Sequence, residues 1–534
     1  MFNKVRISIN LIGSIFSAFL LTLSFPKWNL WILGFFSLIP LFFSLILTKE
    51  NKNKIIFSFI FGIIHFSTLL YWLVYTLTKY GNLNLIISLF LLLLLSSYLA
   101  LYYVFFFYTN FKLKIFESPN FIKGLFFSLT LVGMEYLRGK LLTGFPWGQL
   151  GYILSNFSPF LQLADIGGIW GLSFICALIN YYIFFFLYSF YFSLKPLLNF
   201  RFLINNLCFL IFFITFLSYG IYKKSFWEKL ISQEKNSIKI SLLQGNIPQE
   251  MKELSEIEYS LKIYKKLALS ALKEKPHIIF FPETSFPFFF PYEKEPTLKL
   301  LAFLEKLTLE SKKFDYLPVS IFGTFRLKYK NGNPFVYNSL IVWDGKDFVD
   351  LYDKEKLVPF GEYVPLEKYL SFLRRITIGL GIVKPGFSKN LSFSLKDEII
   401  KVTPLICFES AFSEILRKRL KENPQLIFIA TNDAWFGKTS APYQHFQMAI
   451  VRAVEARRYT VQVANTGITG IIDPTGKIMK MTKLEKEEIV YEKIKPLYER
   501  TFFIKYGNIL GIGGSLILLF SFILTLFLAK FLNP

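Results

Sequence analysis

Long stretches of apolar residues without a charged side chain constrain this fold more strongly than any other feature of the sequence. Each is close to or above the roughly 20 residues that a helix needs to cross a lipid bilayer. A weaker segment at 121–136 contains Lys123 and Glu135, and Arg138 lies one helical turn from Glu135 and could neutralise it. We therefore predict a polytopic α-helical membrane bundle with eight spans. The seven uncharged stretches are 7–26, 28–48, 55–78, 82–111, 166–194, 202–222 and 506–529.

The first stretch follows a basic start, which is also typical of a signal peptide. No small-x-small cleavage site follows it and further spans come next, so we expect a retained helix. With the N-terminus inside the cell, the inner segments carry most of the lysine and arginine, which satisfies the positive-inside rule. The inner set is Lys4, Arg6, Lys49, Lys52, Lys54, Lys112, Lys114, Lys123, Lys195, Arg201 and Lys530, and the outer set is Lys27, Lys79, Arg138 and Lys140.

These spans divide the chain of 534 residues into three parts. We predict a membrane domain of seven helices at 1–222, an extracytoplasmic domain at 223–500 and a C-terminal transmembrane helix at 501–534. In the middle part, continuous apolar strands alternate with helices, a pattern that indicates α/β sheets covered by helices. The predicted strands are 238–243, 278–281, 319–324, 339–343, 402–406, 426–430 and 459–465, with a helix near 257–273.

The composition supports a membrane protein and argues against nucleic acid as a partner. Hydrophobic residues make up 53% of the chain and the mean hydropathy is +0.44, which is too apolar for an ordinary soluble protein. The net charge of +23 comes mostly from lysines scattered among apolar stretches, without an RNA-binding signature. Anionic lipid headgroups explain this charge more simply, so we expect membrane lipids and no nucleic acid as partners.

Cys407 is the one cysteine in the polar part of the chain, because Cys176 and Cys208 lie inside apolar stretches. A disulfide framework is therefore impossible there. The apolar residues 402–406 lead directly into Cys407, and 408–410 are typical of the opening of a helix. Helix N-termini favour negative charge, so this position would shift the cysteine toward its thiolate form. The alternative is a buried, inert cysteine.

Two other strand ends supply the groups that a nucleophilic cysteine needs. Glu283 follows an apolar strand and can project into a cleft as a proton acceptor. The stretch 351–365 places Lys354, Lys356 and Glu362 at another strand end. A proton acceptor, a cation and a thiol in separate strand-end motifs are the arrangement for covalent acyl chemistry. The residues alone do not decide between Lys354 and Lys356 as the cation.

The order of Glu283, Lys354 and Cys407 in these contexts resembles the nitrilase, or carbon–nitrogen hydrolase, superfamily. The block of membrane helices and the stretch at 357–365 make the chain similar to the apolipoprotein N-acyltransferase family, the membrane-anchored branch. Family members often carry a tryptophan where this chain has Glu-Met-Lys-Glu at 250–253, so no aromatic substrate contact is assigned there. The resemblance covers nearly the whole chain. Its motifs are Thr143-Gly-Phe-Pro-Trp147, Gln244-Gly-Asn-Ile-Pro248, Leu357-Val-Pro-Phe-Gly-Glu-Tyr-Val-Pro365, Thr431-Asn-Asp-Ala-Trp-Phe-Gly437, Arg452-Ala-Val-Glu-Ala-Arg457 and Asn465-Thr-Gly-Ile-Thr-Gly-Ile-Ile-Asp-Pro-Thr-Gly476.

This resemblance implies a four-layer α-β-β-α sandwich and a catalytic triad of Glu283, Lys354 and Cys407. In that chemistry Glu283 accepts the thiol proton and Cys407 attacks an ester carbonyl. Lys354 and the backbone N–H of Phe408 hold the developing oxyanion.

Two further carboxylates, Glu362 and Glu409, match acidic positions of the family motif. We expect Glu362 to orient the lysine and Glu409 to orient the turn of the nucleophile, although each could instead be a surface carboxylate. His277 and His445 have no partner at metal-ligand spacing and there is no Cys/His cluster, so we predict no metal and no cofactor.

The resemblance also implies a reaction and a location. A fatty acyl chain would pass from a phospholipid, through a thioester on Cys407, to the α-amino group of the N-terminal diacylglyceryl-cysteine of a lipoprotein. The protein would be a monomer in the bacterial plasma (inner) membrane, with its 223–500 domain on the extracytoplasmic (periplasmic) side. The alternatives are a membrane-tethered amidase or nitrilase that hydrolyses a C–N bond, and a non-catalytic binding protein.

Two apolar segments flank the expected site, at 286–292 and 369–385. Gly379 and Gly381 in the second segment could act as hinges. A soluble amidase would seldom expose such stretches, so we expect both to be loops that dip toward the bilayer and admit lipid chains. The alternative is that they belong to the hydrophobic core.

Overall fold

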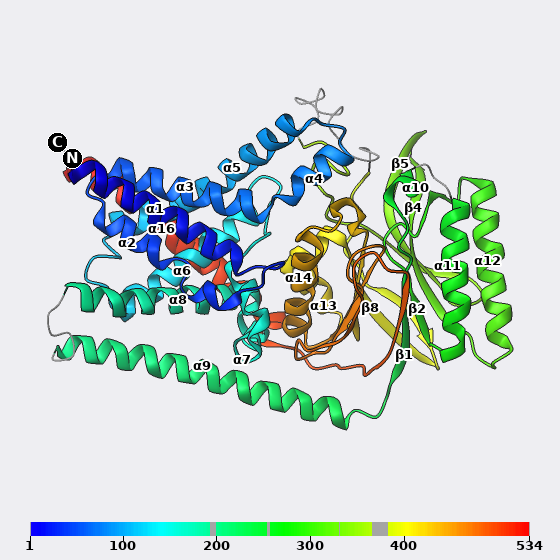
Figure 1. Ribbon diagram of the computed structural model, residues 1–534. Coiled ribbons are helices and arrows are strands. Elements are labelled where there is room, and N and C mark those ends of the chain that lie inside the picture. The colour runs from blue at the N-terminus through cyan, green and yellow to red at the C-terminus, as the bar shows by residue number, and fades with distance from the viewer. Residues whose placement is uncertain (1, 193–198, 254–256, 331, 366–382, 533–534) are drawn as a thin grey trace. The chain divides into compact units, whose positions relative to one another are not determined.

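The computed structural model describes residues 2–192, 199–253, 257–330, 332–365 and 383–532 (Figure 1). The chain forms two compact units. The first comprises Met1–Val74, Asn84–Lys224 and Tyr506–Pro534, and the second comprises Tyr75–Leu83 and Ser225–Lys505. The second unit therefore includes a short segment, 75–83, that belongs by sequence to the predicted membrane domain.

Helices form the regular structure of the first unit in the part of the chain described. Its interior is rich in phenylalanine: the ring of Phe42 contacts those of Phe107, Phe116, Phe127 and Phe184, at centroid distances of 5.1–6.4 Å. The helices are α1 (Phe2–Leu23), η1 (Trp31–Phe35), α2 (Ile39–Leu47), α3 (Asn51–Leu69), α4 (Trp72–Lys79), α5 (Leu85–Lys112), α6 (Phe121–Arg138), η2 (Leu150–Asn156), α7 (Ser158–Leu161), α8 (Ala164–Phe192), α9 (Phe200–Gln233) and α16 (Ile509–Leu532), of which α4 and α9 continue into the second unit.

The eight predicted spans all overlap helical segments, but they do not all meet the criteria for a membrane span. Four helices are long and apolar enough by themselves: α5, α8, α9 and the Ile509–Leu528 part of α16. α3 and α4 meet the criteria together and are bent by 56° at the break between them. Two shorter apolar helices cover Ser8–Leu23 and Trp31–Leu47. The described residues thus give four candidate spans, or five with the bent pair, and the other predicted spans stay predictions.

The weakest predicted span, α6, packs against the C-terminal helix α16 through glycine. A Cβ added to Gly133 would lie 2.2 Å from the carbonyl carbon of Gly514, so the two backbones touch. The Ser515 hydroxyl donates a hydrogen bond to the Gly133 carbonyl at 3.1 Å. Small residues allow this close approach where lipid provides no hydrophobic driving force between helices.

The charged residues of α6 hold the segment that follows it. Glu135 Oε1 accepts a hydrogen bond from the Leu150 N–H at 2.6 Å. The Arg138 guanidinium donates to the carbonyls of Trp147 at 2.8 Å and Gly148 at 3.4 Å. Both buried charges therefore fix the backbone at the end of the Thr-Gly-Phe-Pro-Trp motif.

The second unit contains two β-sheets. The first has the strand order β13-β1-β2-β4-β5-β6, with β3 also paired to β4, and the second has the order β12-β11-β10-β9-β8-β7. Neighbours among β1 to β4 and among β8 to β10 are parallel, and the other pairs are antiparallel. The strands are β1 (Ile238–Gln244), β2 (Ile278–Phe280), β3 (Phe286–Phe290), β4 (Val319–Lys330), β5 (Asn333–Trp343), β6 (Phe348–Asp353), β7 (Leu391–Leu395), β8 (Glu398–Ile406), β9 (Leu426–Thr431), β10 (Tyr459–Ala464), β11 (Gly470–Ile472), β12 (Ile478–Met481) and β13 (Glu488–Ile494).

The two sheets share one hydrophobic core, in which the rings of Phe280 and Phe428 lie 4.6 Å apart. The helices α11 (Ile257–Ala271) and α12 (Lys294–Lys312) pack on the other face of the first sheet around Phe281 (Figure 1). The helices α13 (Ser413–Leu420) and α14 (Ala441–Ala456) pack against β8 and β10. This is the α-β-β-α order that the resemblance implied. Short helices at α10 (Gln249–Glu253), η4 (Leu272–Glu274), η6 (Cys407–Ala411), η7 (Asp433–Phe436) and α15 (Phe502–Tyr506) complete the described elements.

The seven predicted strands and the helix near 257–273 are confirmed, but one apolar loop prediction is wrong. Residues 286–290 form β3, and Phe286 and Phe288 are buried in the core with α11 and α12. These side chains cannot dip toward a bilayer. The other expected loop, 369–385, lies outside the described residues except for 383–385, where Val383 is buried and forms a bridge with Val336.

Candidate active site

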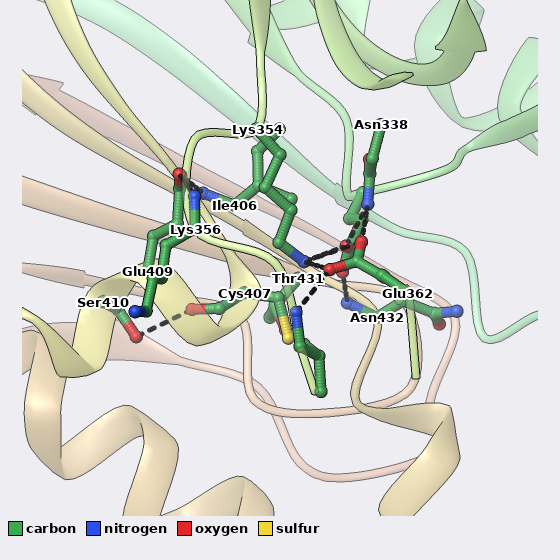
Figure 2. A network of polar contacts seen from close by, with 12 residues as sticks. Asn338, Lys354, Lys356, Glu362, Ile406, Cys407, Glu409, Ser410, Thr431 and Asn432 are labelled. Atoms are coloured by element: carbon green, nitrogen blue, oxygen red, sulfur yellow. Dashed lines mark hydrogen bonds and ion pairs between the residues drawn. The ribbon is translucent and has the colours of Figure 1, made fainter. Parts of the chain in front are cut away.

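The sheet topology brings the predicted site residues to one edge of the sandwich. β6 runs parallel to β2, because antiparallel β5 lies between β4 and β6. Glu283, just after β2, and Lys354, directly after β6, therefore leave their strands in the same direction. In the other sheet, parallel β8 and β9 end at Cys407 and Asn432. Figure 2 shows these chain ends converging on one polar network.

Cys407 lies at a sharp turn between β8 and η6. Its φ is 51°, a left-handed conformation that a side chain adopts only when the surroundings fix it. The Ser410 hydroxyl donates a hydrogen bond to its carbonyl at 2.9 Å. The predicted sequence of strand, turn and helix is therefore present, although the helix opens as a 3₁₀ turn.

The prediction that this turn shifts Cys407 toward its thiolate form is wrong for the resting protein. Burial, followed by the nearby Glu283 carboxylate, raises the pKa of the Cys407 thiol above its usual range, and the Lys354 ammonium opposes this only in part. The thiol is therefore protonated at neutral pH. Any nucleophilic role then needs a base that removes its proton.

Glu283 is the candidate for this base. Its Oε1 accepts a hydrogen bond from Asn338 Nδ2 at 2.8 Å and lies 3.4 Å from Lys354 Nζ. Its Oε2 accepts a hydrogen bond from the Asn432 N–H at 2.9 Å. Gly323 lies behind this turn, where an added Cβ would be 2.4 Å from the Thr284 nitrogen. The carboxylate is thus buried and fixed from both sheets.

The structure separates the two lysines that the sequence left open. Lys354 is 1% exposed, and its Nζ contacts Glu362 at 3.0 Å and Glu283 at 3.4 Å. Burial lowers the pKa of Lys354, but the Glu362 and Glu283 carboxylates more than offset this and raise the pKa above its ordinary value. Lys356 Nζ instead lies 4.9 Å from the centre of the Phe412 ring. Only Lys354 thus brings a permanent cation to Glu283.

Asn338 on β5 is a site residue that the sequence analysis missed. Its side-chain amide donates to Glu283 at 2.8 Å and to Glu362 at 2.9 Å, so it bridges the two carboxylates (Figure 2). Glu362 Oε2 also accepts the Val358 N–H at 2.8 Å. Glu362 thus contacts both Asn338 and Lys354, and its role in orienting the lysine stays a prediction. An asparagine inside a strand of apolar residues was the available signal.

Glu409 is fully buried and connects the turn at Cys407 to the loop at Lys354. Its Oε2 accepts the Ile406 N–H at 2.8 Å, and its Oε1 accepts the N–H groups of Glu355 at 2.8 Å and Lys356 at 3.0 Å. The Tyr352 hydroxyl donates to the same Oε1 at 2.6 Å. The surface alternative is therefore excluded for Glu409.

Phe408 follows Cys407 in the first turn of η6, where backbone N–H groups have no acceptor within the helix. Its ring is buried and meets the Phe412 ring edge-on at 5.0 Å. This packing fixes the backbone that carries the N–H beside Cys407.

The short helix α10 borders Glu283, and the segment 75–83 in turn contacts α10; neither was predicted. Lys252 on α10 is 5% exposed, and its Nζ donates to the Glu283 carbonyl at 3.3 Å. Burial lowers the pKa of Lys252 to about 7, although the Glu283 charge works in the other direction. The segment 75–83 pairs with α10 through Lys79 and Glu250, 2.9 Å apart. The Tyr80 hydroxyl of that segment donates to the Ala434 carbonyl at 3.3 Å, at η7.

Together these groups provide a half-buried thiol, a carboxylate that can take its proton and a permanent cation. That combination suits attack on an ester or amide carbonyl and stabilisation of the oxyanion that forms. In the part of the chain described, no group of three or more His, Cys, Asp and Glu side chains could hold a metal ion.

Comparison with known proteins gives matches along nearly the whole chain. The model of the apolipoprotein N-acyltransferase N-terminal domain matches residues 17–182, and that of carbon-nitrogen hydrolase matches residues 239–501. The chain is 33% identical to the apolipoprotein N-acyltransferase of Geobacter metallireducens, with 93% of this chain and 91% of the relative covered. For the enzymes of the same name from Wigglesworthia glossinidia brevipalpis and Haemophilus influenzae, the identities are 32% and 30%. These two alignments cover 94% and 99% of this chain, and 95% and 99% of the relatives.

Proposed function

This chain belongs to the apolipoprotein N-acyltransferase family, and from that membership we infer that it N-acylates lipoproteins. It is an acyltransferase of lipoprotein maturation, with a phospholipid as acyl donor and a lipoprotein as acceptor. The nitrilase-like α/β fold of the second unit fits cysteine-based chemistry. The long apolar helices of the first unit fit a bacterial inner-membrane protein.

We propose Glu283, Lys354 and Cys407 as the catalytic residues. The observation that carries this proposal is one buried ammonium group, Lys354 Nζ, placed 3.4 Å from Glu283 and 3.0 Å from Glu362. When Glu283 loses its negative charge by accepting a proton, the Glu362 carboxylate still faces the ammonium and keeps the lysine charged. Lys354 can therefore stabilise an oxyanion throughout the reaction.

In the first half-reaction, Glu283 takes the proton of the Cys407 thiol, and the sulfur attacks the carbonyl carbon of the phospholipid ester. The Lys354 ammonium and the Phe408 N–H hold the oxyanion that forms. When the tetrahedral intermediate collapses, the carbon–oxygen ester bond breaks. The leaving lysophospholipid oxygen receives the proton from Glu283, and a thioester remains on Cys407.

In the second half-reaction, the neutral α-amino group of the diacylglyceryl-cysteine attacks the thioester carbonyl. This group has a pKa near about 8, so a substantial fraction is neutral at physiological pH. Glu283 takes a proton from the attacking nitrogen, the carbon–sulfur bond breaks, and the proton returns to the Cys407 sulfur. The product is the N-acylated lipoprotein.

For the whole chain we propose eight spans, with 1–222 and 501–534 in the membrane and 223–500 as the catalytic domain on the extracytoplasmic side. The positive-inside distribution of lysine and arginine supports this orientation. We propose that the protein acts as a monomer, since each proposed catalytic residue comes from one chain.

The catalytic assignment is tested by comparing the two neighbouring lysines. Replacing Glu283, Lys354 or Cys407 with alanine should lower the rate of N-acylation at least about a hundredfold, the usual scale for a general base or an oxyanion donor. Lys356→Ala is the matched control and should have a mild effect, because its ammonium lies against Phe412. Mass spectrometry of a diacylglyceryl peptide incubated with phospholipid measures the rate. A large loss of rate in Lys356→Ala together with a small loss in Lys354→Ala would contradict the assignment.

A further inference from the structure

A buried chain of three polar side chains lies directly behind the nucleophile and has no part in the steps above. His445 on α14 contacts Ser410 through Nε2 at 2.8 Å and Asp433 through Nδ1 at 2.9 Å. All three side chains are at most 1% exposed. Because Ser410 belongs to η6 and Asp433 to η7, the imidazole connects the turn of Cys407 to the turn that follows β9.

The contacts of this imidazole decide how many protons it carries. Nε2 lies 3.1 Å from the carbonyl oxygen of Cys407, which can only accept a hydrogen bond. Ser410 already donates its one hydroxyl proton to that same carbonyl. Nε2 must therefore be an N–H donor, since otherwise its lone pair would face lone pairs of oxygen.

The other nitrogen leads to the same result. Nδ1 faces Oδ1 of Asp433, which also accepts the Thr431 hydroxyl at 2.8 Å. A carboxylate has an ordinary pKa far below that of histidine, so the shared proton belongs on Nδ1. Both ring nitrogens then carry hydrogen, and His445 is an imidazolium paired with the Asp433 carboxylate.

We propose that the His445 imidazolium, paired with Asp433, is a positioning device that holds the Cys407 backbone in its left-handed conformation and makes acyl transfer depend on the protonation of His445. The proposal rests on the proposed role of Cys407 as the nucleophile. A carbonyl that receives two donors, Ser410 and His445, keeps a backbone of φ 51° from relaxing.

The pair of His445 and Asp433 is also connected to Glu283, the proposed base. Asp433 follows Asn432, whose backbone N–H donates to Glu283 Oε2 at 2.9 Å. A shift of Asp433 toward or away from His445 therefore moves the hydrogen bond that orients Glu283. One buried ion pair thus fixes both the attacking sulfur and the group that takes its proton.

Electrostatics around His445 give the expected direction of the pH dependence. Burial lowers the pKa of His445, but Asp433, the Cys407 carbonyl and the Glu283 charge together raise the pKa above its ordinary value. The charged groups that raise its pKa are Asp433 from η7 and Glu283 from the turn after β2, and the Cys407 backbone carbonyl from η6 acts in the same direction. The ion pair between His445 and Asp433 is present while His445 is protonated, and it is lost as the pH rises through the folded-state pKa of His445.

Nitrogen-15 NMR of histidine-labelled full-length protein in detergent tests the protonation state directly. The chain has three histidines, and His445→Gln identifies the signal of His445. We expect an imidazolium at pH 7 that titrates above the ordinary value for histidine. In contrast, burial lowers the pKa of His277 to about 4, so its ring is neutral at pH 7. A neutral His445 at pH 7 would overturn the proposal, whatever the activity of the protein.

A pH profile of Cys407 acylation by phospholipid tests the functional consequence. Asp433→Asn keeps an acceptor for Nδ1 but removes the charge, so the alkaline loss of activity should move to lower pH. His445→Gln keeps one N–H donor but does not titrate, so the loss of activity at high pH should disappear. The rate of acylation should fall about tenfold to a hundredfold, the range for a hydrogen bond to a charged group. His277→Asn is the matched control and should change neither the rate nor the loss of activity at high pH.

The outcomes separate this inference from the proposed function. Suppose that the unaltered protein forms the acyl adduct and that neither variant changes the loss of acylation at high pH. The proposed positioning role of His445 is then wrong, and the catalytic assignment stands. If the unaltered protein forms no adduct on Cys407, the proposed function fails, and the NMR result still decides the state of His445.

Discussion

Burial decides the chemistry of Cys407 more strongly than its place at a turn. The charge at a helix N-terminus is worth about 0.3–1 kcal/mol, which is less than one pKa unit. Removing a thiolate from water can raise a pKa by about 3–5 units. The sequence shows the turn but not the surroundings of the thiol, so it predicts a shift toward the thiolate where burial and the Glu283 charge raise the pKa of Cys407.

The choice of Lys354 over Lys356 was likewise beyond the residues alone, and only the resemblance assigned Lys354. The Lys354 N–H donates to the Asn338 carbonyl at 2.8 Å, so the strand pairing holds Lys354 beside β5. Two residues later the chain has turned, and the Lys356 N–H binds Glu409 instead. Spacing alone does not reveal where a strand pairing stops.

Lys252 gives a prediction of how the stability of the folded protein depends on pH. Its pKa is about 7 in the folded protein because it is buried, compared with 10.5 ordinarily. Between these values the unfolded chain binds a proton that the folded chain does not, so this residue makes stability rise with pH from about 7 to 10. Lys252→Met should remove that rise. The measurement is the unfolding temperature of the full-length protein in detergent between pH 7 and 10.

The exposed Lys346, replaced by methionine, is the control for Lys252 and should leave the rise unchanged. An equal rise in the unaltered protein and in Lys252→Met would show that Lys252 is not buried as the structure has it.

At the scale of elements, seven of the thirteen strands in the described residues were predicted from the sequence and six were not, β3 among them. Runs such as 402–406 and 426–430 read as strands because they are continuous, short and bounded by polar residues. β3 contains Pro287 among phenylalanines, and it pairs with β4 through a shifted register. The apolar stretch at 286–292 was predicted to be a loop that dips toward the bilayer, and the packing of Phe286 against α11 and α12 shows the alternative, a place in the core.

The segment 75–83 shows a second limit of the sequence. Its apolar and aromatic residues continue a predicted membrane span, yet they belong to the second unit and contact α10 and η7. These contacts join positions more than 150 residues apart, which no local pattern can reveal.

At the scale of the whole molecule, the proposed orientation predicts which side of the membrane carries the second unit. Lys346 lies in an exposed turn between β5 and β6. A Lys346→Cys change in a Cys407→Ala background should react with a membrane-impermeant thiol reagent in spheroplasts, and the Cys407→Ala protein alone should not. Labelling that requires lysis would place residues 223–500 inside the cell.

We propose that Cys407 carries the acyl chain from one substrate to the other, and mass spectrometry of the intact protein tests this directly. The purified protein is incubated with phospholipid alone and then with a diacylglyceryl peptide. We predict that Cys407 gains the mass of one fatty acyl chain, keeps it because the buried site limits attack by water, and passes it to the peptide amine with ping-pong kinetics. Steady release of free fatty acid without peptide, with no adduct on Cys407, would contradict the account and favour a hydrolase.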